Sequence, residues 1–119
     1  MVQSSITFLP VKDIIVTEKF YTEIVGLKLW KDMGNCKIFS CGEGYFGFCQ
    51  YNDNREFPLG VCLSMNLEST EAVDNEYIRL KELGINIKSK PQKHPNVPVY
   101  SFFFEDINGY TLEFQKITD

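Results

Sequence analysis

The C-terminal part of the sequence places one carboxylate, Glu113, inside a pattern typical of a β-strand. The alternation puts two apolar residues on one side and three polar residues on the other: Leu112 and Phe114 against Thr111, Glu113 and Gln115. A carboxylate at such a position either points to water or faces a cavity. In a cavity it can orient a ligand, move a proton or bind a metal ion.

A tight turn precedes this strand. Asp106 and the pair Asn108-Gly109 supply short side chains and tolerance of positive φ, so residues 102–115 read as a hairpin. Three interpretations of Glu113 remain open. It is a carboxylate hydrogen-bonded to Ser5 or Thr7, an acceptor that orients a ligand, or a base or metal ligand.

The composition narrows the class of protein. With 119 residues the chain is long enough for one domain with a core, and its net charge of −4 with scattered Lys and Arg argues against nucleic-acid binding. No apolar stretch reaches the roughly 20 residues that span a bilayer, and no charged-then-apolar leader begins the sequence.

The four cysteines form no CxxC pair and lie in or beside apolar runs: Cys36, Cys41, Cys49 and Cys62. This pattern favours buried free thiols over a disulfide framework, and predicts a reducing, cytoplasmic location. We expect Cys62 to be an inert thiol rather than a nucleophile, because no adjacent base lowers its pKa.

The elements that must position these residues occur twice in the same order. A strand at 6–10, a helix between Asp13 and Gly26, and strands at 27–33, 37–41 and 45–51 form the first set. A strand at 61–67, a helix at about 70–83 capped by Ser69 or Thr70, and strands at 85–90, 99–105 and 110–117 form the second. The helix stops Gly26 and Gly84 are 58 positions apart, which indicates an internal duplication.

We therefore predict an α+β fold of two tandem βαβββ modules within a single domain spanning 1–119. Module one covers about 1–52 and module two about 60–119, joined by a polar, Asp/Asn-rich linker at 52–59. Along the strands, large apolar residues alternate with small polar ones. Small polar side chains gathered on one sheet face suggest a concave surface with room for a ligand, although an antiparallel sheet can also simply be wet on one face.

This pattern resembles the vicinal oxygen chelate superfamily, which holds glyoxalase I, extradiol dioxygenases, fosfomycin-modifying enzymes and bleomycin-sequestering proteins. The resemblance covers nearly the whole chain. It rests on Val11-Lys12-Asp13, Phe20-Tyr21, Gly26-Leu27 and the stretch from Glu105-Asp106 through Asn108-Gly109 to Leu112-Glu113. It implies curled mixed sheets that form a cleft, helices on the outer face and, usually, a homodimer.

In metal-using members of that superfamily, the first and last strands of each module supply the ligands. Carried over to this sequence, those positions fall on Ser5, on Cys62, on Glu113, and on Gly47, Phe48 or Gln50. Only Glu113 is an unambiguous ligand, since a neutral serine is a poor one. A mixed site of Cys62, Glu113 and Gln50 for Zn, Ni or Mn remains an alternative.

The single histidine, His94, lies in a proline-punctuated loop at 90–98. It is either an exposed loop residue or part of a lid whose imidazole could exchange protons near neutral pH. Aromatic residues such as Trp30 and Phe46 suit a core, a dimer interface or an aromatic wall beside a ligand.

The leading prediction is a metal-independent binder of a small organic molecule. The residues expected to face the ligand are Ser5, Thr7, Phe48, Gln50, Cys62, Ser64, His94, Phe103 and Glu113, with Glu113 as the candidate catalytic group. The alternatives are a metal-dependent lyase or thiol transferase resembling glyoxalase I, and a regulatory module that binds a partner protein.

Overall fold

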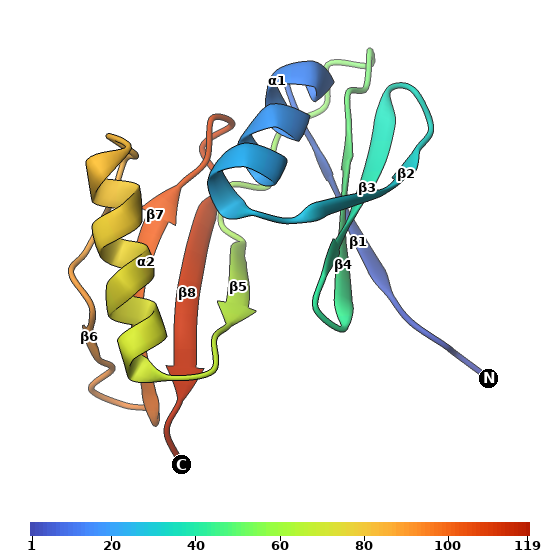
Figure 1. Cartoon of the computed structure of the whole chain (residues 1–119). Coiled ribbons are helices and arrows are strands. Elements are labelled where there is room, and N and C mark those ends of the chain that lie inside the picture. The colour runs from blue at the N-terminus through green and yellow to red at the C-terminus, as the bar shows by residue number, and fades with distance from the viewer. The chain divides into compact units, whose positions relative to one another are not determined.

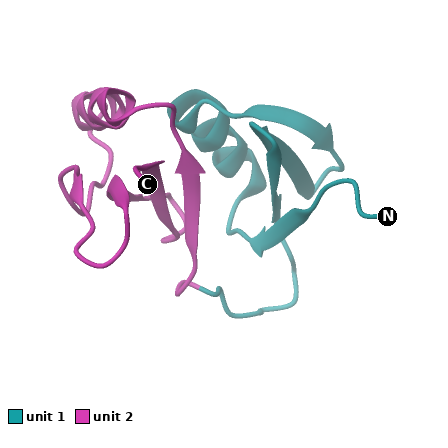
Figure 2. Ribbon diagram, turned by 90° about the horizontal axis from the view of Figure 1, so that it is seen from below, with its two compact units in different colours: residues 1–58 teal, residues 59–119 magenta.

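The computed structural model describes all residues, 1–119, and divides them into two compact units, Met1–Pro58 and Leu59–Asp119. Figure 1 shows the elements and Figure 2 colours the two units. No helix is long and apolar enough to cross a membrane. Each unit repeats the order strand, helix, three strands, so the prediction of two βαβββ modules is confirmed.

The first unit contains β1 (Ile6–Pro10), α1 (Ile14–Lys19), a π-helical turn η1 (Phe20–Val25), β2 (Lys28–Asp32), β3 (Cys36–Cys41) and β4 (Gly44–Cys49). Its sheet has the order β1-β4-β3-β2, in which β1 runs parallel to β4 and the other pairs are antiparallel. The parallel pairing is possible because α1 and the hairpins separate the two strands in the chain.

Side-chain caps explain where the first helix begins, and a glycine explains where the helical segment ends. The Asp13 carboxylate accepts hydrogen bonds from the amides of Ile15 and Val16, and the Gln50 side chain accepts one from Ile14 at 2.9 Å. These bonds satisfy amides that have no partner within the helix. Gly26 ends η1 with a φ of 90°, a left-handed conformation that glycine adopts without strain.

The second unit contains β5 (Cys62–Asn66), α2 (Thr70–Glu82), β6 (Gln92–Lys93), β7 (Val99–Glu105) and β8 (Thr111–Ile117). The sheet order is β5-β8-β7-β6, with β5 parallel to β8. The Ser69 hydroxyl caps α2 by accepting from the Ala72 amide. In Figure 1, α2 lies along β7 and β8.

The predicted strand at 85–90 is wrong. Only a single bridge between Ile87 and Phe104 forms there, and the edge strand is the two-residue β6 that follows. Lys88 donates its amide to the Phe103 carbonyl, but the Phe103 amide donates to the Ser89 hydroxyl instead of returning a backbone bond. A side-chain acceptor thus interrupts the ladder.

Aromatic side chains form the core of each unit under its helix. In the first unit the Tyr21 ring stacks on Phe48 at 4.4 Å between centroids, and both side chains are fully buried together with Phe39. In the second unit Phe104 stacks on Phe114 at 5.3 Å, and Leu80 and Val73 of α2 are fully buried. Burial of such large rings is the main stabilising contribution to each unit.

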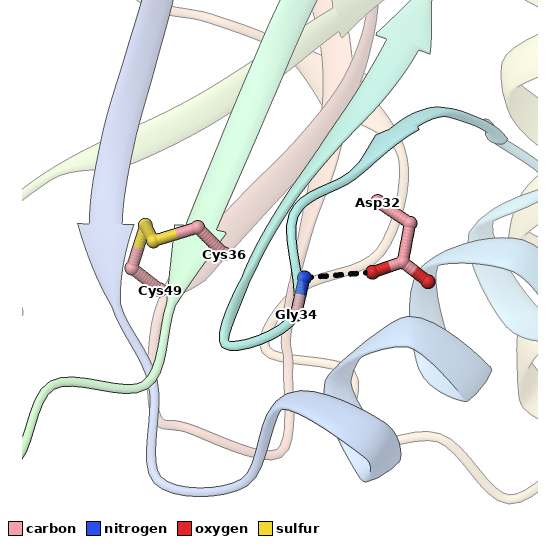
Figure 3. Close-up of a disulfide and its surroundings, with 4 residues drawn as sticks. All are labelled: Asp32, Gly34, Cys36 and Cys49. Atoms are coloured by element: carbon pink, nitrogen blue, oxygen red, sulfur yellow. Dashed lines mark hydrogen bonds between the residues drawn. A yellow bond between two sulfur atoms is a disulfide. The ribbon is translucent and has the colours of Figure 1, made fainter.

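The cysteine prediction is wrong for two of the four residues. Cys36 and Cys49 form a disulfide between β3 and β4, where they lie directly opposite each other (Figure 3). The Gln50 amide donates to the Asn35 carbonyl, so the cysteines occupy a non-hydrogen-bonded pair, where opposing side chains are closest. The apolar residues around Cys49 correctly predict that it is buried, but they do not predict that it pairs with Cys36. The cytoplasmic prediction therefore loses the basis it had in these two thiols.

Candidate functional site

The helix-free face of the second sheet carries a set of polar side chains that we call the polar face. It is made by the residues of β5 and β8 that point away from α2: Cys62, Ser64, Asn66, Thr111, Glu113 and Gln115. Neighbours along each strand, such as Leu63 and Leu112, are buried on the helix side. The alternation in the sequence predicts this arrangement, because successive strand residues point to opposite faces.

The strand register places the polar residues in facing pairs. Ser64 lies opposite Glu113, and its hydroxyl donates a hydrogen bond to the Glu113 carboxylate. One pair further along, the Gln115 side-chain amide donates to Asn66 at 2.9 Å. Glu113 is only 8% exposed, so its carboxylate is a fixed, largely desolvated acceptor.

A lysine and a second carboxylate border the polar face. The Lys88 ammonium donates to the Thr111 hydroxyl at 2.8 Å and lies 3.5 Å from Glu105. Lys88 is not among the site residues predicted from the sequence. Alternation from Ile87 does put the Lys88 side chain on the opposite side of its segment. Because this segment is not a regular strand, however, alternation alone does not fix which way the side chain points.

Cys62 lies on the polar face, where its surroundings favour the protonated thiol. Partial burial raises its pKa, and the nearby Glu113 carboxylate raises it further, whereas a hydrogen bond with Ser64 and the Lys88 charge act in the opposite direction. The net shift is upward, which disfavours the thiolate. The expectation of an unreactive thiol at this position therefore has a physical basis.

Four of the predicted ligand-facing residues belong to the other unit. Ser5 is exposed and precedes β1. Thr7 is exposed but lies on the helix side of β1, the side of Leu9, which is buried opposite Phe48. Phe48 is fully buried against Tyr21 and is inaccessible to a ligand. Gln50 uses its carbonyl oxygen to cap α1, which holds this side chain at the start of the helix in the first unit.

The side of β1 that faces the helix is the opposite of the one expected from the sequence, and the cause is local. Ile6 and Phe8 occupy the helix-free side, and Leu9 is buried on the helix side opposite Phe48. The Phe8 ring lies over Gly47, where a Cβ would come within 2.4 Å of Phe8 Cδ1. Both sides of β1 carry a large apolar residue, so alternation alone did not decide which side packs under the helix.

His94 and Phe103 have different positions relative to Glu113. Phe103 is the direct neighbour of Glu113 in the β7–β8 register. The His94 amide instead bonds Val99, which pairs with Ile117, four residues from Glu113 and thus roughly 13 Å along the strand. The His94 ring is exposed, and its Nδ1 accepts from the Asn96 amide, so the structure does not bring it to Glu113.

The donor set on the polar face does not fit a divalent ion. No three side chains from His, Cys, Asp and Glu converge anywhere in the chain. Around Glu113 the available groups are a protonated thiol, hydroxyls and amides, whereas Zn, Ni and Mn need several imidazole, carboxylate or thiolate ligands. The arrangement is suited to hydrogen bonding of a ligand.

The comparisons with known proteins agree with the fold. The chain belongs to the Glyoxalase/Bleomycin resistance protein/Dioxygenase superfamily, whose model matches residues 4–114. The resemblance inferred from Asp13, Gly26 and the turn before Glu113 is thus confirmed. Among curated proteins, no sequence matches significantly.

Solved structures of the same fold cover nearly the entire chain. A glyoxalase/bleomycin resistance protein/dioxygenase from Nocardioides aligns with a TM-score of 0.79 and 21% identity over 100% of this chain and 85% of its own. A lactoylglutathione lyase from Agrobacterium tumefaciens gives 0.75 and 21% over 98% and 94%. A fosfomycin resistance protein from Listeria monocytogenes gives 0.77 and 21% over 98% and 93%. At these identities the similarity establishes the fold alone.

Proposed function

We propose that the chain binds a small organic molecule on the polar face of its second unit, without a metal ion. The observation that supports this most is the carboxylate of Glu113, which is 8% exposed, fixed by Ser64 and surrounded by amides and hydroxyls. A desolvated, preorientated acceptor of this kind favours a ligand that presents hydrogen-bond donors, such as an amine or a hydroxyl group.

Binding is favoured over catalysis by the chemistry of the neighbouring groups. The Cys62 thiol has a raised pKa, so no thiolate nucleophile stands beside Glu113. A lyase of the glyoxalase kind would need an ion to polarise its substrate, and the donor set does not supply the ligands. The metal-dependent activity is the alternative that the experiment below must distinguish from binding.

The test is a thermal-shift screen of amine- and hydroxyl-bearing metabolites, with bleomycin and fosfomycin included because relatives bear those names. We expect a subset of compounds to raise the melting temperature equally with and without a chelator. Glu113→Gln should abolish the shift, whereas Glu82→Gln, an exposed carboxylate on α2, should leave it unchanged.

Two results would contradict the proposal. If the stabilisation disappears on chelation, or if added Zn, Ni or Mn produces isomerisation of a hemithioacetal, the metal-dependent alternative replaces it. If no compound stabilises the protein but it forms a stable complex in pull-downs, the partner-binding alternative replaces it.

We also propose that the chain acts as a homodimer, as membership of the superfamily supports. The measurement is the molar mass from size-exclusion chromatography with light scattering. A mass of twice 13.8 kDa is expected, and a mass of 13.8 kDa at all concentrations would contradict it.

A further inference from the structure

A hollow of about 360 Å³ lies in the first unit, separate from the polar face. It is formed between the turn that joins β1 to α1 and the segment that follows β4. The side chains that matter for its chemistry are Lys12, Gln50, Tyr51, Asn52, Asn54 and Arg55. Its volume falls at the lower end of the range for small-molecule sites.

The charged residues that line this hollow are all cationic. Lys12 and Arg55 line it, and no carboxylate does. The carboxylates nearest in sequence to the two cations are Asp13, Asp53 and Glu56. Asp13 accepts from two amides of α1, Asp53 holds Arg55, and Glu56 is exposed and does not line the hollow. Asp53 balances the charge of Arg55, so an anion in the hollow meets the positive charge of Lys12 and the remaining N–H donors of Arg55, with no carboxylate among the lining residues. The protein as a whole carries a net charge of −4.

The Arg55 guanidinium is held in place. Its Nε lies 3.0 Å from Asp53 Oδ1 and its Nη2 lies 2.5 Å from Asp53 Oδ2. Its central carbon lies 3.5 Å from the centre of the Tyr51 ring. A guanidinium carries five N–H donors, more than Asp53 uses, so Arg55 can bind an anion with little additional loss of side-chain freedom.

The amide side chains around the hollow add neutral donors. Because the Gln50 oxygen accepts from the Ile14 amide, the NH₂ group is the end of Gln50 that remains for a ligand. The side chains of Asn52 and Asn54, which also line the hollow, make no hydrogen bond within the structure. Asn54 adopts a φ of 56°, which turns the chain immediately before Arg55. A site rich in N–H donors matches a ligand rich in acceptor oxygens.

We propose that this hollow binds a small organic anion. Its carboxylate or phosphate oxygens contact Arg55 and Lys12, and an aromatic body packs against Tyr51 and Phe57, which also lines the hollow. The site uses none of the residues of the polar face, so it is independent of the function proposed above.

The test titrates the full-length protein with phenyl phosphate and benzoate, and with inorganic phosphate and neutral benzamide as comparisons, by calorimetry. Phenyl phosphate and benzoate should bind saturably, and benzamide at least about tenfold more weakly, since a tenfold change corresponds to about 1.4 kcal/mol. Inorganic phosphate should bind more weakly than phenyl phosphate, because it lacks the aromatic body that packs against Tyr51 and Phe57; equal binding of the two would contradict this part of the proposal. Added salt should weaken binding of the anions.

Variants locate the site. Arg55→Gln and Lys12→Gln should each weaken phenyl phosphate by about tenfold, whereas Lys31→Gln, a lysine of the same unit outside the hollow, should not. Arg55→Lys, which keeps the charge but not the planar fork, should have an intermediate effect and guards against misfolding of the Gln variant. Absence of saturable anion binding, equal binding of benzamide, or loss of binding in Glu113→Gln rather than Arg55→Gln would each overturn the proposal.

Discussion

Burial raises the pKa of the Cys62 thiol most, and the charge of its neighbour on the polar face, Glu113, raises it further. The carboxylate disfavours a second negative charge nearby, so it raises the pKa of the thiol in addition to the effect of burial. Ser64 is bonded to the same carboxylate, which keeps the charge in place. The thiol therefore stays protonated at neutral pH although its side chain is exposed.

We predict that Cys62 reacts slowly with iodoacetamide at neutral pH and that Glu113→Gln accelerates the reaction. The substitution removes the charge that disfavours the thiolate, which is the nucleophile. The measurement is the rate of alkylation against pH, followed by mass spectrometry in a Cys41→Ser background, so that Cys62 is the one free thiol.

Cys41 provides the control for this prediction. It belongs to the first unit, and its pKa is raised by burial alone. In a Cys62→Ser background, Glu113→Gln should leave the alkylation rate of Cys41 unchanged. Equal acceleration at both cysteines would mean that the variant loosens the fold rather than changes a local charge.

At the residue level, the alternation in the sequence predicts the polar face of the second unit, but in the first unit it does not predict which side of β1 faces the helix. Period-two alternation placed Cys62, Ser64 and Glu113 together because β5 and β8 have one clearly apolar side. In β1 both sides are apolar, and the direction depended on Gly47, which makes space for Phe8 only through a pairing that the sequence does not reveal.

The start of α1 depends on two side chains from different parts of the first unit. We predict that Asp13→Ala and Gln50→Ala each lower the free energy of unfolding by about 1 kcal/mol, because each leaves helix amides without an acceptor. Urea denaturation followed by circular dichroism measures the change. Asp13→Asn keeps an acceptor oxygen and should cost less; a loss as large as that of alanine would argue against capping as the cause.

The disulfide joins β3 to β4 immediately before Gln50. We predict that reduction, or the double variant Cys36→Ser/Cys49→Ser, lowers the free energy of unfolding by about 3 kcal/mol. The bond closes a loop with a sequence separation of 13 residues, and opening it increases the freedom of the unfolded chain.

Thermal unfolding with and without dithiothreitol measures this contribution. The Cys41→Ser/Cys62→Ser variant should respond to the reductant as the native protein does, since those two cysteines are not bonded. An unchanged melting temperature on reduction would contradict a stabilising role for the Cys36–Cys49 bond.

At the element level the sequence predicted most boundaries because local chemistry sets them. Asp13 and Ser69 cap the helices, Gly26 and Gly84 have the positive φ that ends them, and β1 and β7 have their predicted bounds. The failure at 85–90 had a different origin. Alternation there was strand-like, but the Ser89 hydroxyl took an amide that the backbone ladder needed, which is a long-range contact.

Across the whole chain, two units of the same plan carry different chemistry on their helix-free faces. The first presents Phe8 over Gly47, with Trp30 and Tyr45 in contact at 4.5 Å, and the second presents the polar face around Glu113. A duplicated fold preserves the elements and their caps, whereas the residues that point away from the helix are free to change. The side chains at those positions, and not the shared fold, therefore determine what each unit can bind.

The stability of the protein at high pH depends on groups that keep their protons only when folded. Burial, with a smaller contribution from the Asp106 charge, raises the pKa of Tyr110 to about 12, against 10.0 for the ordinary phenol. The unfolded chain therefore releases this proton at lower pH than the folded chain. The stabilising contribution is complete below pH 10 and is lost as the pH rises towards 12.

We predict that the free energy of unfolding falls between about pH 10 and pH 12 and that Tyr110→Phe makes this fall shallower. The substitution should not remove the fall, because Lys37 contributes to it as well. The pKa of Lys37 is raised mainly by its hydrogen bond to Glu18, so its contribution to the free energy of unfolding is also lost as the pH rises. Urea unfolding at a series of pH values gives the slope, and Tyr45→Phe, a half-buried tyrosine of the first unit, is the matched control. An unchanged slope in Tyr110→Phe would show that the buried phenol is not responsible for the alkaline loss, whereas a shallower slope in this variant alone assigns it to the turn before β8.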